Sequence, residues 1–137
     1  MALAGQPGVT VVGQVPDIRP SLSAAGIFVC PLRWGAGVKN KILAALAMGK
    51  PVVASRLSAE GLELRDGVDW LVADDAADLA EKVVRLIEDP SYARQLAQSG
   101  KRAVTQRYSW SASARRLEKV LRELVEDARA TSHRPEH

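Results

Sequence analysis

Four short, mainly apolar runs mark the first half of the chain. Each is close to strand length and ends at a residue typical of turns, and they cover residues 9–12, 27–30, 51–54 and 70–72. The runs are continuous instead of alternating, which is the pattern of strands buried on both faces of a sheet. We therefore predict a parallel sheet built from four short strands.

Helical segments separate the first three predicted strands. One is expected at residues 18–25, with Asp17 as its N-cap. The next is expected from about Val38 to Met48, where Gly49 can adopt the left-handed conformation that ends many helices. Strands that alternate with helices predict a three-layer α/β domain of the Rossmann-like type.

The chain becomes continuously helical after the fourth apolar run. Asp75 and Ser109 are expected N-caps of the first and last of three helices, and Pro90 is expected to open the middle one. Gly100 lies inside that middle helix, where glycine lowers helix stability. We expect one domain and then a disordered tail without apolar residues, at residues 1–130 and 131–137.

Composition narrows the class of protein. Of the 137 residues, 47% are hydrophobic and 26% are charged, as in a soluble globular domain and unlike a disordered chain. No apolar stretch approaches the ~20 residues of a membrane span. A single cysteine, Cys30, excludes a disulfide scaffold, and the first residues lack the features of a signal peptide. We therefore expect a cytoplasmic protein with a buried, unreactive thiol.

The charges do not indicate nucleic-acid binding. The chain has 19 basic and 16 acidic residues, which gives a net charge of +3, and the two signs interleave along the sequence. Binding to nucleic acid calls for clustered positive charge, and the 4% of aromatic residues are too few for base stacking. The mixed charges instead indicate a solvated surface, including the pair Arg115 and Arg116 on the last helix.

The loop after the second apolar run has the features of an anion site. Gly35 and Gly37 allow close approach of a ligand to the backbone and lead into a helix N-terminus, which attracts anions. Arg33, Lys39 and Lys41 add positive charge around this point. Ligands of open parallel sheets bind beyond the carboxyl ends of the strands, which is where this loop is expected. A phosphate or diphosphate therefore fits the loop.

The glycine pattern alone leaves a second interpretation open. Asn40 stands where a dinucleotide fingerprint has its third glycine, and no Gly-Lys-Ser/Thr of a P-loop is present. A strand-to-helix turn that needs small residues, followed by solvated lysines, explains these residues equally well.

A series of motifs across the chain carries further information. They include the Gly-x-Gly-x-Lys-x-Lys segment that opens the second helix and the run A-M-G-K-P-V-V-A-S after it; the series covers residues 13–17, 28–31, 35–41, 47–55, 59–61 and 108–110. In this order the motifs resemble the C-terminal, donor-binding domain of GT-B-fold glycosyltransferases. The nearest resemblance is to retaining "glycosyl transferases group 1" (family 4), including exopolysaccharide sugar transferases.

The resemblance implies a site for a nucleotide-diphosphate sugar. The helix start would hold the donor diphosphate through backbone N–H groups, within a set formed by Arg33, Gly35, Gly37, Val38, Lys39, Asn40 and Lys41. The nucleobase and ribose region would comprise Val15, Pro16, Asp17 and Ala44. Glu60 would lie near the donor sugar, although a simple surface carboxylate explains this residue slightly better. The resemblance implies neither a metal nor a cofactor.

The chain departs from the family pattern at two positions. The family has a ribose-binding glutamate at the position of Ala44 and often a second acidic residue at the position of Ala36. Alanine cannot accept hydrogen bonds from ribose hydroxyls. These residues favour an alternative function, a non-catalytic binding or assembly module derived from a transferase, whereas the glycines and lysines of the loop favour donor binding.

The resemblance also implies a missing part. A complete enzyme of this type has an N-terminal acceptor domain, and its C-terminal domain begins before the position of Val9. We therefore expect the chain to be the donor-binding half of an enzyme and to be inactive alone. The third alternative, a phosphorylation receiver domain, lacks support because no acidic cluster follows the first strand.

The last helix carries an apolar stripe. Residues spaced by four and three positions share one side of a helix, and this series consists of Trp110, Ala114, Leu117, Leu121, Leu124 and Ala128. Two arrangements would bury the stripe. The helix could fold back onto its own sheet in a monomer, or it could pair in a homodimer, which we favour.

Overall fold

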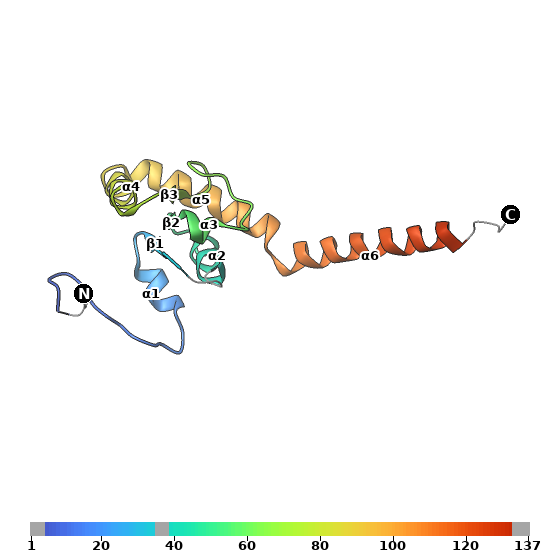
Figure 1. Ribbon diagram of the computed structural model, residues 1–137. Coiled ribbons are helices and arrows are strands. Elements are labelled where there is room, and N and C mark those ends of the chain that lie inside the picture. The colour runs from blue at the N-terminus through green and yellow to red at the C-terminus, as the bar shows by residue number, and fades with distance from the viewer. Residues whose placement is uncertain (1–4, 35–38, 133–137) are drawn as a thin grey trace.

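The computed structural model describes residues 5–34 and 39–132. Within these residues the chain forms six helices and three strands (Figure 1). In chain order they are α1 (Arg19–Ala24), β1 (Phe28–Cys30), α2 (Lys39–Ala47), β2 (Val52–Ser55), α3 (Arg56–Ala59), β3 (Leu71–Ala73), α4 (Ala76–Glu88), α5 (Pro90–Arg107) and α6 (Trp110–Ser132).

The strands form a parallel sheet in the order β1-β2-β3. Phe28 pairs with Val52, and Val53 pairs with Leu71. Val52 and Val53 point to opposite faces, and neither has measurable exposure. Burial on both faces explains why the strand sequences are continuously apolar. The prediction of a Rossmann-like α/β domain is confirmed.

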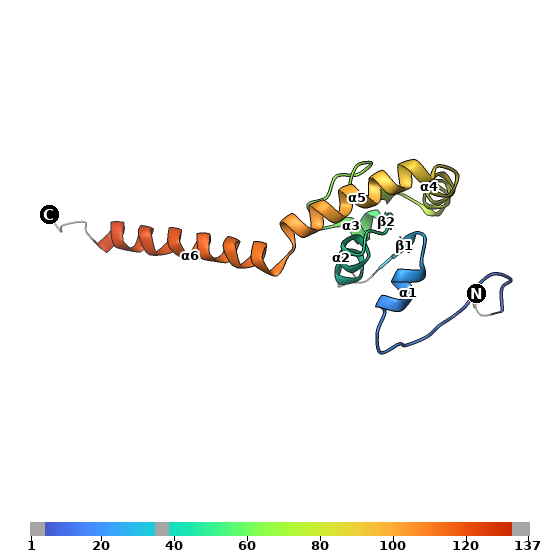
Figure 2. The ribbon, with the colours of Figure 1, turned by 180° about the vertical axis from the view of Figure 1, so that it is seen from behind.

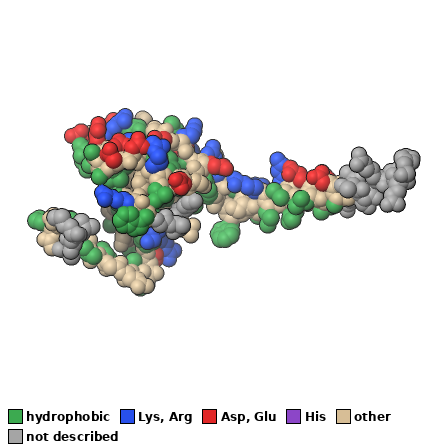
Figure 3. Space-filling model, in the orientation of Figure 1, with side chains coloured by type: hydrophobic (Ala, Val, Ile, Leu, Met, Phe, Trp, Pro, Cys, Tyr) green, Lys and Arg blue, Asp and Glu red, His purple; other side chains and the backbone are tan. Residues whose placement is uncertain are grey.

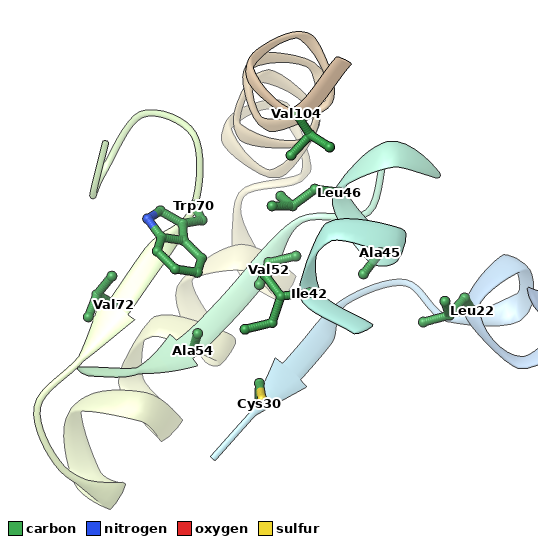
Figure 4. Packing of buried hydrophobic residues seen from close by; sticks show 10 residues of the cluster. All are labelled: Leu22, Cys30, Ile42, Ala45, Leu46, Val52, Ala54, Trp70, Val72 and Val104. Carbon is green, nitrogen blue, oxygen red and sulfur yellow. The ribbon is translucent and has the colours of Figure 1, made fainter. Parts of the chain in front are cut away.

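Helices cover both faces of the sheet. On one face, Ile42 and Leu46 of α2 pack with Val52 and Ala54 of β2, as Figure 4 shows. On the other face, Val53 packs with residues of α4 and α5 in a second cluster that comprises Val53, Leu71, Ala73, Leu86 and Leu96. Helix α5 joins both layers, because its later residue Val104 belongs to the first cluster. The core is thus three-layered.

The predicted first strand is wrong. Residues 9–12 lie outside the sheet, and Val11 and Val12 are 62% and 64% exposed. Figure 1 shows this segment running away from the body of the fold. A strand needs a hydrogen-bonded neighbour, and residues 9–12 pair with none of the three strands.

The helix starts agree with the expected caps, with one correction. The side chains of Asp75, Asp89 and Ser109 accept backbone N–H groups at the starts of α4, α5 and α6. The N-cap of α1 is Ile18 rather than Asp17, and Pro20 lies in the first turn of the helix. The Asp17 carboxylate still accepts the backbone N–H of Arg19 at 2.9 Å.

Helix α6 extends away from the rest of the molecule, as Figures 1 and 2 show from opposite sides. Its apolar stripe is exposed: Trp110 is 93% exposed, Leu117 60% and Leu124 60%. The arrangement in which α6 folds back onto its own sheet is therefore absent from this structure. The helix runs to Ser132, two residues into the predicted tail, and residues 133–137 lie outside the described part of the chain.

A buried carboxylate connects α5 to the loop before β3. Asp69, which is 1% exposed, accepts hydrogen bonds from the backbone and side chain of Arg65 and from the Ser99 hydroxyl at 2.7 Å. Burial raises the pKa of Asp69, but these hydrogen bonds outweigh it and lower the pKa to about 2. Asp69 is therefore ionised at neutral pH and holds the loop against α5.

Candidate functional site

A cavity of about 540 Å³ opens at the carboxyl ends of all three strands. Residues that follow β1, β2 and β3 line it together with the first turns of α4; they are Pro31, Leu32, Arg33, Ser55, Arg56, Leu57, Ala73, Asp74, Asp75, Ala76 and Leu79. This is the edge at which open α/β sheets bind ligands. The cavity is therefore the candidate functional site.

Serine hydroxyls fix the loops that form the floor of the cavity. The Ser55 hydroxyl donates to the Leu32 carbonyl oxygen at 2.7 Å and lies 2.9 Å from the Ser58 hydroxyl. The buried Ser58 hydroxyl in turn donates to the Cys30 carbonyl oxygen at 3.3 Å. These bonds tie the end of β1 to the end of β2. The Cys30 side chain is buried beside them, as expected.

Two arginines and two aspartates give the cavity its charge. The Arg56 guanidinium donates to the Asp74 carboxylate, with Nε 2.6 Å from Oδ1. The Asp75 carboxylate is occupied as the N-cap of α4. Within the described part of the chain, Arg33 forms neither a hydrogen bond nor an ion pair. Among the described residues that line the cavity, the Arg33 guanidinium is thus the cation that is open to an anionic ligand.

The structure describes only part of the predicted diphosphate-binding set. Arg33 lines the cavity. Gly35, Gly37 and Val38, like Ala36, lie outside the described residues. Lys39 is the first residue of α2, and the side chains of Asn40 and Lys41 in the same turn are exposed. The residues of α2 are not among those that line the cavity, and the diphosphate-binding role of this set stays a prediction.

The predicted nucleobase and ribose residues do not line the cavity. Val15 is half-buried and Pro16 exposed, on the segment before α1. Asp17 forms an ion pair with Arg19 at 2.9 Å, and hydrogen bonds from Arg19 lower the pKa of the Asp17 carboxyl. Ala44 is half-buried on α2 and packs against the core.

Glu60 also lies outside the residues that line the cavity. It is exposed and follows the short helix α3. This position agrees with the interpretation of Glu60 as a surface carboxylate.

The sequence interpretation missed three charged residues of the cavity as site residues: Arg56, Asp74 and Asp75. Their position in the sequence could have identified them, because they directly follow β2 and β3, in loops that the predicted sheet brings to the same edge. Helix α3 was also missed. Its signal is Ser55, whose hydroxyl accepts the backbone N–H of Ser58.

The described residues show neither a metal site nor a membrane-spanning helix. Residues 5–34 and 39–132 contain no group of three or more His, Cys, Asp or Glu side chains placed to bind a metal ion. Among the helices in these ranges, none combines the length and the apolar character that a membrane crossing requires.

The parallel sheet with helices on both faces and a cavity at its carboxyl edge defines an α/β domain of the Rossmann-like class. The family model for "Glycosyl transferases group 1" matches residues 1–89. The chain therefore belongs to the group 1 glycosyl transferases, as the motifs predicted.

Characterised relatives include two mycobacterial enzymes. The chain is 34% identical over 116 residues to phosphatidyl-myo-inositol mannosyltransferase of Mycobacterium leprae, which covers 82% of this chain and 31% of the relative. It is 35% identical over 106 residues to alpha-maltose-1-phosphate synthase of Mycobacterium tuberculosis, which covers 71% and 27%. The chain thus spans less than a third of the length of these relatives.

Solved structures share the fold. The C-terminal domain of the group 1 glycosyl transferase LpcC of Francisella tularensis superposes with a TM-score of 0.65 at 23% identity, over 74% of this chain and 53% of that one. Sucrose-phosphate synthase of Thermosynechococcus elongatus superposes with a TM-score of 0.60 at 27% identity, over 80% and 28%. The fold is thus that of the C-terminal domain of a GT-B glycosyltransferase.

Proposed function

We propose that this chain is the donor-binding half of a retaining glycosyltransferase, which moves a sugar from a nucleotide-diphosphate sugar to an acceptor hydroxyl. The observation that carries the proposal is the cavity at the carboxyl ends of β1, β2 and β3, in a chain of the glycosyltransferase family. Its volume of about 540 Å³ lies in the range of small-molecule sites.

The charges of the cavity support a diphosphate as part of the ligand. Breaking the bond between sugar and diphosphate leaves negative charge on the departing diphosphate, and cations placed beforehand stabilise that charge. Arg33 is available for this role in the cavity. The first turn of α2, which lies outside the residues that line the cavity, would add backbone N–H groups at a helix N-terminus. The proposed reaction uses no metal and no cofactor.

We assign binding of the acceptor to another part of the whole protein. The relatives are more than three times as long as the matched segment, so that a second domain of the acceptor-binding type has room in a protein of their length. We expect this chain alone to bind donor without transferring sugar.

A second function, a non-catalytic binding or assembly module, is favoured by one observation. Ala44 packs against the core on α2 and offers no acceptor for ribose hydroxyls. Such a module would have lost affinity for nucleotides while keeping the fold.

Amide NMR during titration with UDP and GDP tests the proposal. We expect shift changes in the loops after β1, β2 and β3. Arg33→Ala is expected to weaken binding about tenfold, as for loss of a charged hydrogen bond. The matched control is Arg102→Ala, an exposed arginine on α5 away from the cavity, which is expected to bind as the unmodified chain does. No shift at millimolar nucleotide, or shifts confined to other loops, would support the non-catalytic module.

A further inference from the structure

A second cavity lies between α5 and the loop that leads into β3. It has a volume of about 320 Å³, and its polar lining residues are Arg65, Asp69, Ser99, Arg102, Gln106 and Arg107. We call this cavity the α5 pocket. Its described lining residues are all different from those of the cavity at the carboxyl ends of the strands. The α5 pocket is therefore a separate place at which a ligand can bind.

Helix geometry brings most of these residues to one side of α5. Residues at positions i, i+3, i+4 and i+7 of a helix share one face, and here these are Ser99, Arg102, Ala103 and Gln106. The opposite wall is the loop before β3, where the Asp69 carboxylate accepts the Ser99 hydroxyl at 2.7 Å. Figure 1 shows this loop beside α5, and Figure 3 shows Lys and Arg side chains where the two meet.

The carboxylate of the α5 pocket is already satisfied by hydrogen bonds. Asp69 Oδ2 accepts the backbone N–H and the Nε of Arg65, at 3.0 and 3.1 Å. Asp69 Oδ1 accepts Nη2 of Arg65 at 3.1 Å in addition to the Ser99 hydroxyl. The charges of Asp69 and Arg65 therefore compensate each other. The two parallel contacts also fix the direction of the Arg65 guanidinium at the edge of the pocket.

Two further arginines give the α5 pocket an excess of positive charge. Within residues 5–34 and 39–132, Arg102 forms neither a hydrogen bond nor an ion pair. Arg107 donates Nη1 to the Glu63 carbonyl oxygen, a neutral acceptor that positions the guanidinium without cancelling its charge. Among the described lining residues, three arginines stand against one aspartate, which leaves a net formal charge of +2. The pocket thus favours an anion.

The remaining features of the α5 pocket narrow the class of anion. Guanidinium groups bind phosphate through paired N–H donors, and a phosphate group offers oxygens to more than one arginine. Ala103 is the one apolar side chain among the described lining residues, and the Gln106 amide can both donate to and accept from a hydroxyl group. A volume of about 320 Å³ lies at the lower end of the range for small organic ligands.

From these features we infer that the α5 pocket binds the phosphate group of a small, hydroxyl-rich molecule, such as a sugar phosphate. Arg102 and Arg107 hold the phosphate, with Arg65 at its edge, and Gln106 is the partner for a hydroxyl group. The site is independent of the proposed donor site, because the described residues of the two cavities do not overlap. The shared chemistry with a lipid headgroup is the phosphate, and the experiment separates these two sources.

Amide NMR of the full 137-residue chain during titration with glucose 6-phosphate tests the inference. We expect shift changes within residues 65–69 and 99–107, weaker binding of inorganic phosphate and no binding of glucose. Arg102→Ala is expected to weaken binding of glucose 6-phosphate about tenfold, as for loss of a charged hydrogen bond. Arg102→Lys is expected to bind more tightly than Arg102→Ala but less tightly than the unmodified chain, because lysine keeps the charge without the paired donors.

Two controls make the experiment specific. Lys101→Ala removes an exposed positive charge from the same turn of α5, outside the residues that line the pocket, and is expected to change the affinity by less than about twofold. Arg33→Ala removes the cation of the other cavity and is expected to leave the shifts of the α5 pocket unchanged. Failure of donor binding at the carboxyl edge is thereby distinguished from failure of this inference, since the shifts fall on different residues.

Several results would overturn the inference. These are the absence of shifts around the α5 pocket at millimolar glucose 6-phosphate, and equal loss of affinity in Lys101→Ala and Arg102→Ala. Co-sedimentation with phosphatidylcholine vesicles that contain phosphatidylglycerol provides the second arm. If Arg102 is needed for vesicle binding while glucose 6-phosphate does not bind, the ligand is a lipid headgroup and the inference is wrong. Circular dichroism of each variant checks that the domain remains folded.

Discussion

Gly100 of α5 passes so close to Asp69 that a Cβ atom at residue 100 would lie 2.4 Å from the Asp69 carbonyl oxygen. The same Cβ would lie 2.6 Å from a methyl carbon of Leu46 on α2. Gly100 therefore marks the point at which α5 packs directly on the main chain before β3. From the sequence alone, Gly100 is expected to lower the stability of the helix. In the structure, the absence of a side chain at Gly100 allows α5 to contact the main chain at Asp69.

Gly100→Ala is expected to destabilise the domain by about 1–2 kcal/mol. Alanine raises helix propensity by about 1 kcal/mol, but overpacking against backbone atoms outweighs this gain. Urea unfolding followed by circular dichroism measures the difference. The control is Gly26→Ala, where a Cβ meets no atom within 4 Å, and it should change stability by less than about 0.5 kcal/mol. Equal stability of the Gly100→Ala variant would contradict the close packing.

The Asp69 carboxylate makes stability depend on acid pH. Its pKa of about 2 lies below the ordinary value of 3.8, so the ionised form stabilises the folded state above pH 3.8. This contribution, about 2 kcal/mol, is lost as the pH falls from about 5 through 2. In Asp69→Asn, the free energy of unfolding should be lower at pH 7 and should fall less steeply below pH 5. Parallel pH profiles for the two proteins would argue against this role.

Removing the Asp74 charge should strengthen nucleotide binding if the cavity holds a diphosphate. Asp74→Asn releases the Arg56 guanidinium and removes a negative charge at the edge of the site. Because the Asp74 side chain is 64% exposed, the gain is modest, about threefold in affinity for UDP by calorimetry. Glu88→Gln, at the far end of α4, removes an exposed charge elsewhere and should bind as before.

If the nucleotide ribose binds beside Ala44, as the resemblance to the family implies, a carboxylate at this position should strengthen binding. In that case Ala44→Glu would supply an acceptor for ribose hydroxyls, and a charged hydrogen bond contributes about 1.5–3 kcal/mol, or about tenfold or more in affinity. Calorimetry with UDP and GDP measures the change. Ala47→Glu places the same residue at an exposed position of α2 and should have no effect. Equal or weaker binding by the Ala44→Glu protein would show that this contact of the family does not transfer.

Local signals in the sequence predicted most of the elements. The apolar runs before Pro31, Ser55 and Asp74 became β1, β2 and β3, because strands buried on both faces need continuous apolar residues. Asp75 and Ser109 began helices where expected, since an N-cap depends only on its own next few residues. The motifs likewise identified the family, as the match over residues 1–89 shows.

Tertiary contacts decided what these local signals could not. Residues 9–12 have the same β-branched character as the true strands but lie outside the sheet, because a strand exists only with a partner. The pairing of Arg56 with Asp74 and the contact of Gly100 with Asp69 join residues distant in sequence. The sequence also could not decide whether the apolar stripe of α6 is exposed. The spacing of Leu117, Leu121 and Leu124 determines that they share one face of a helix, but not what covers that face.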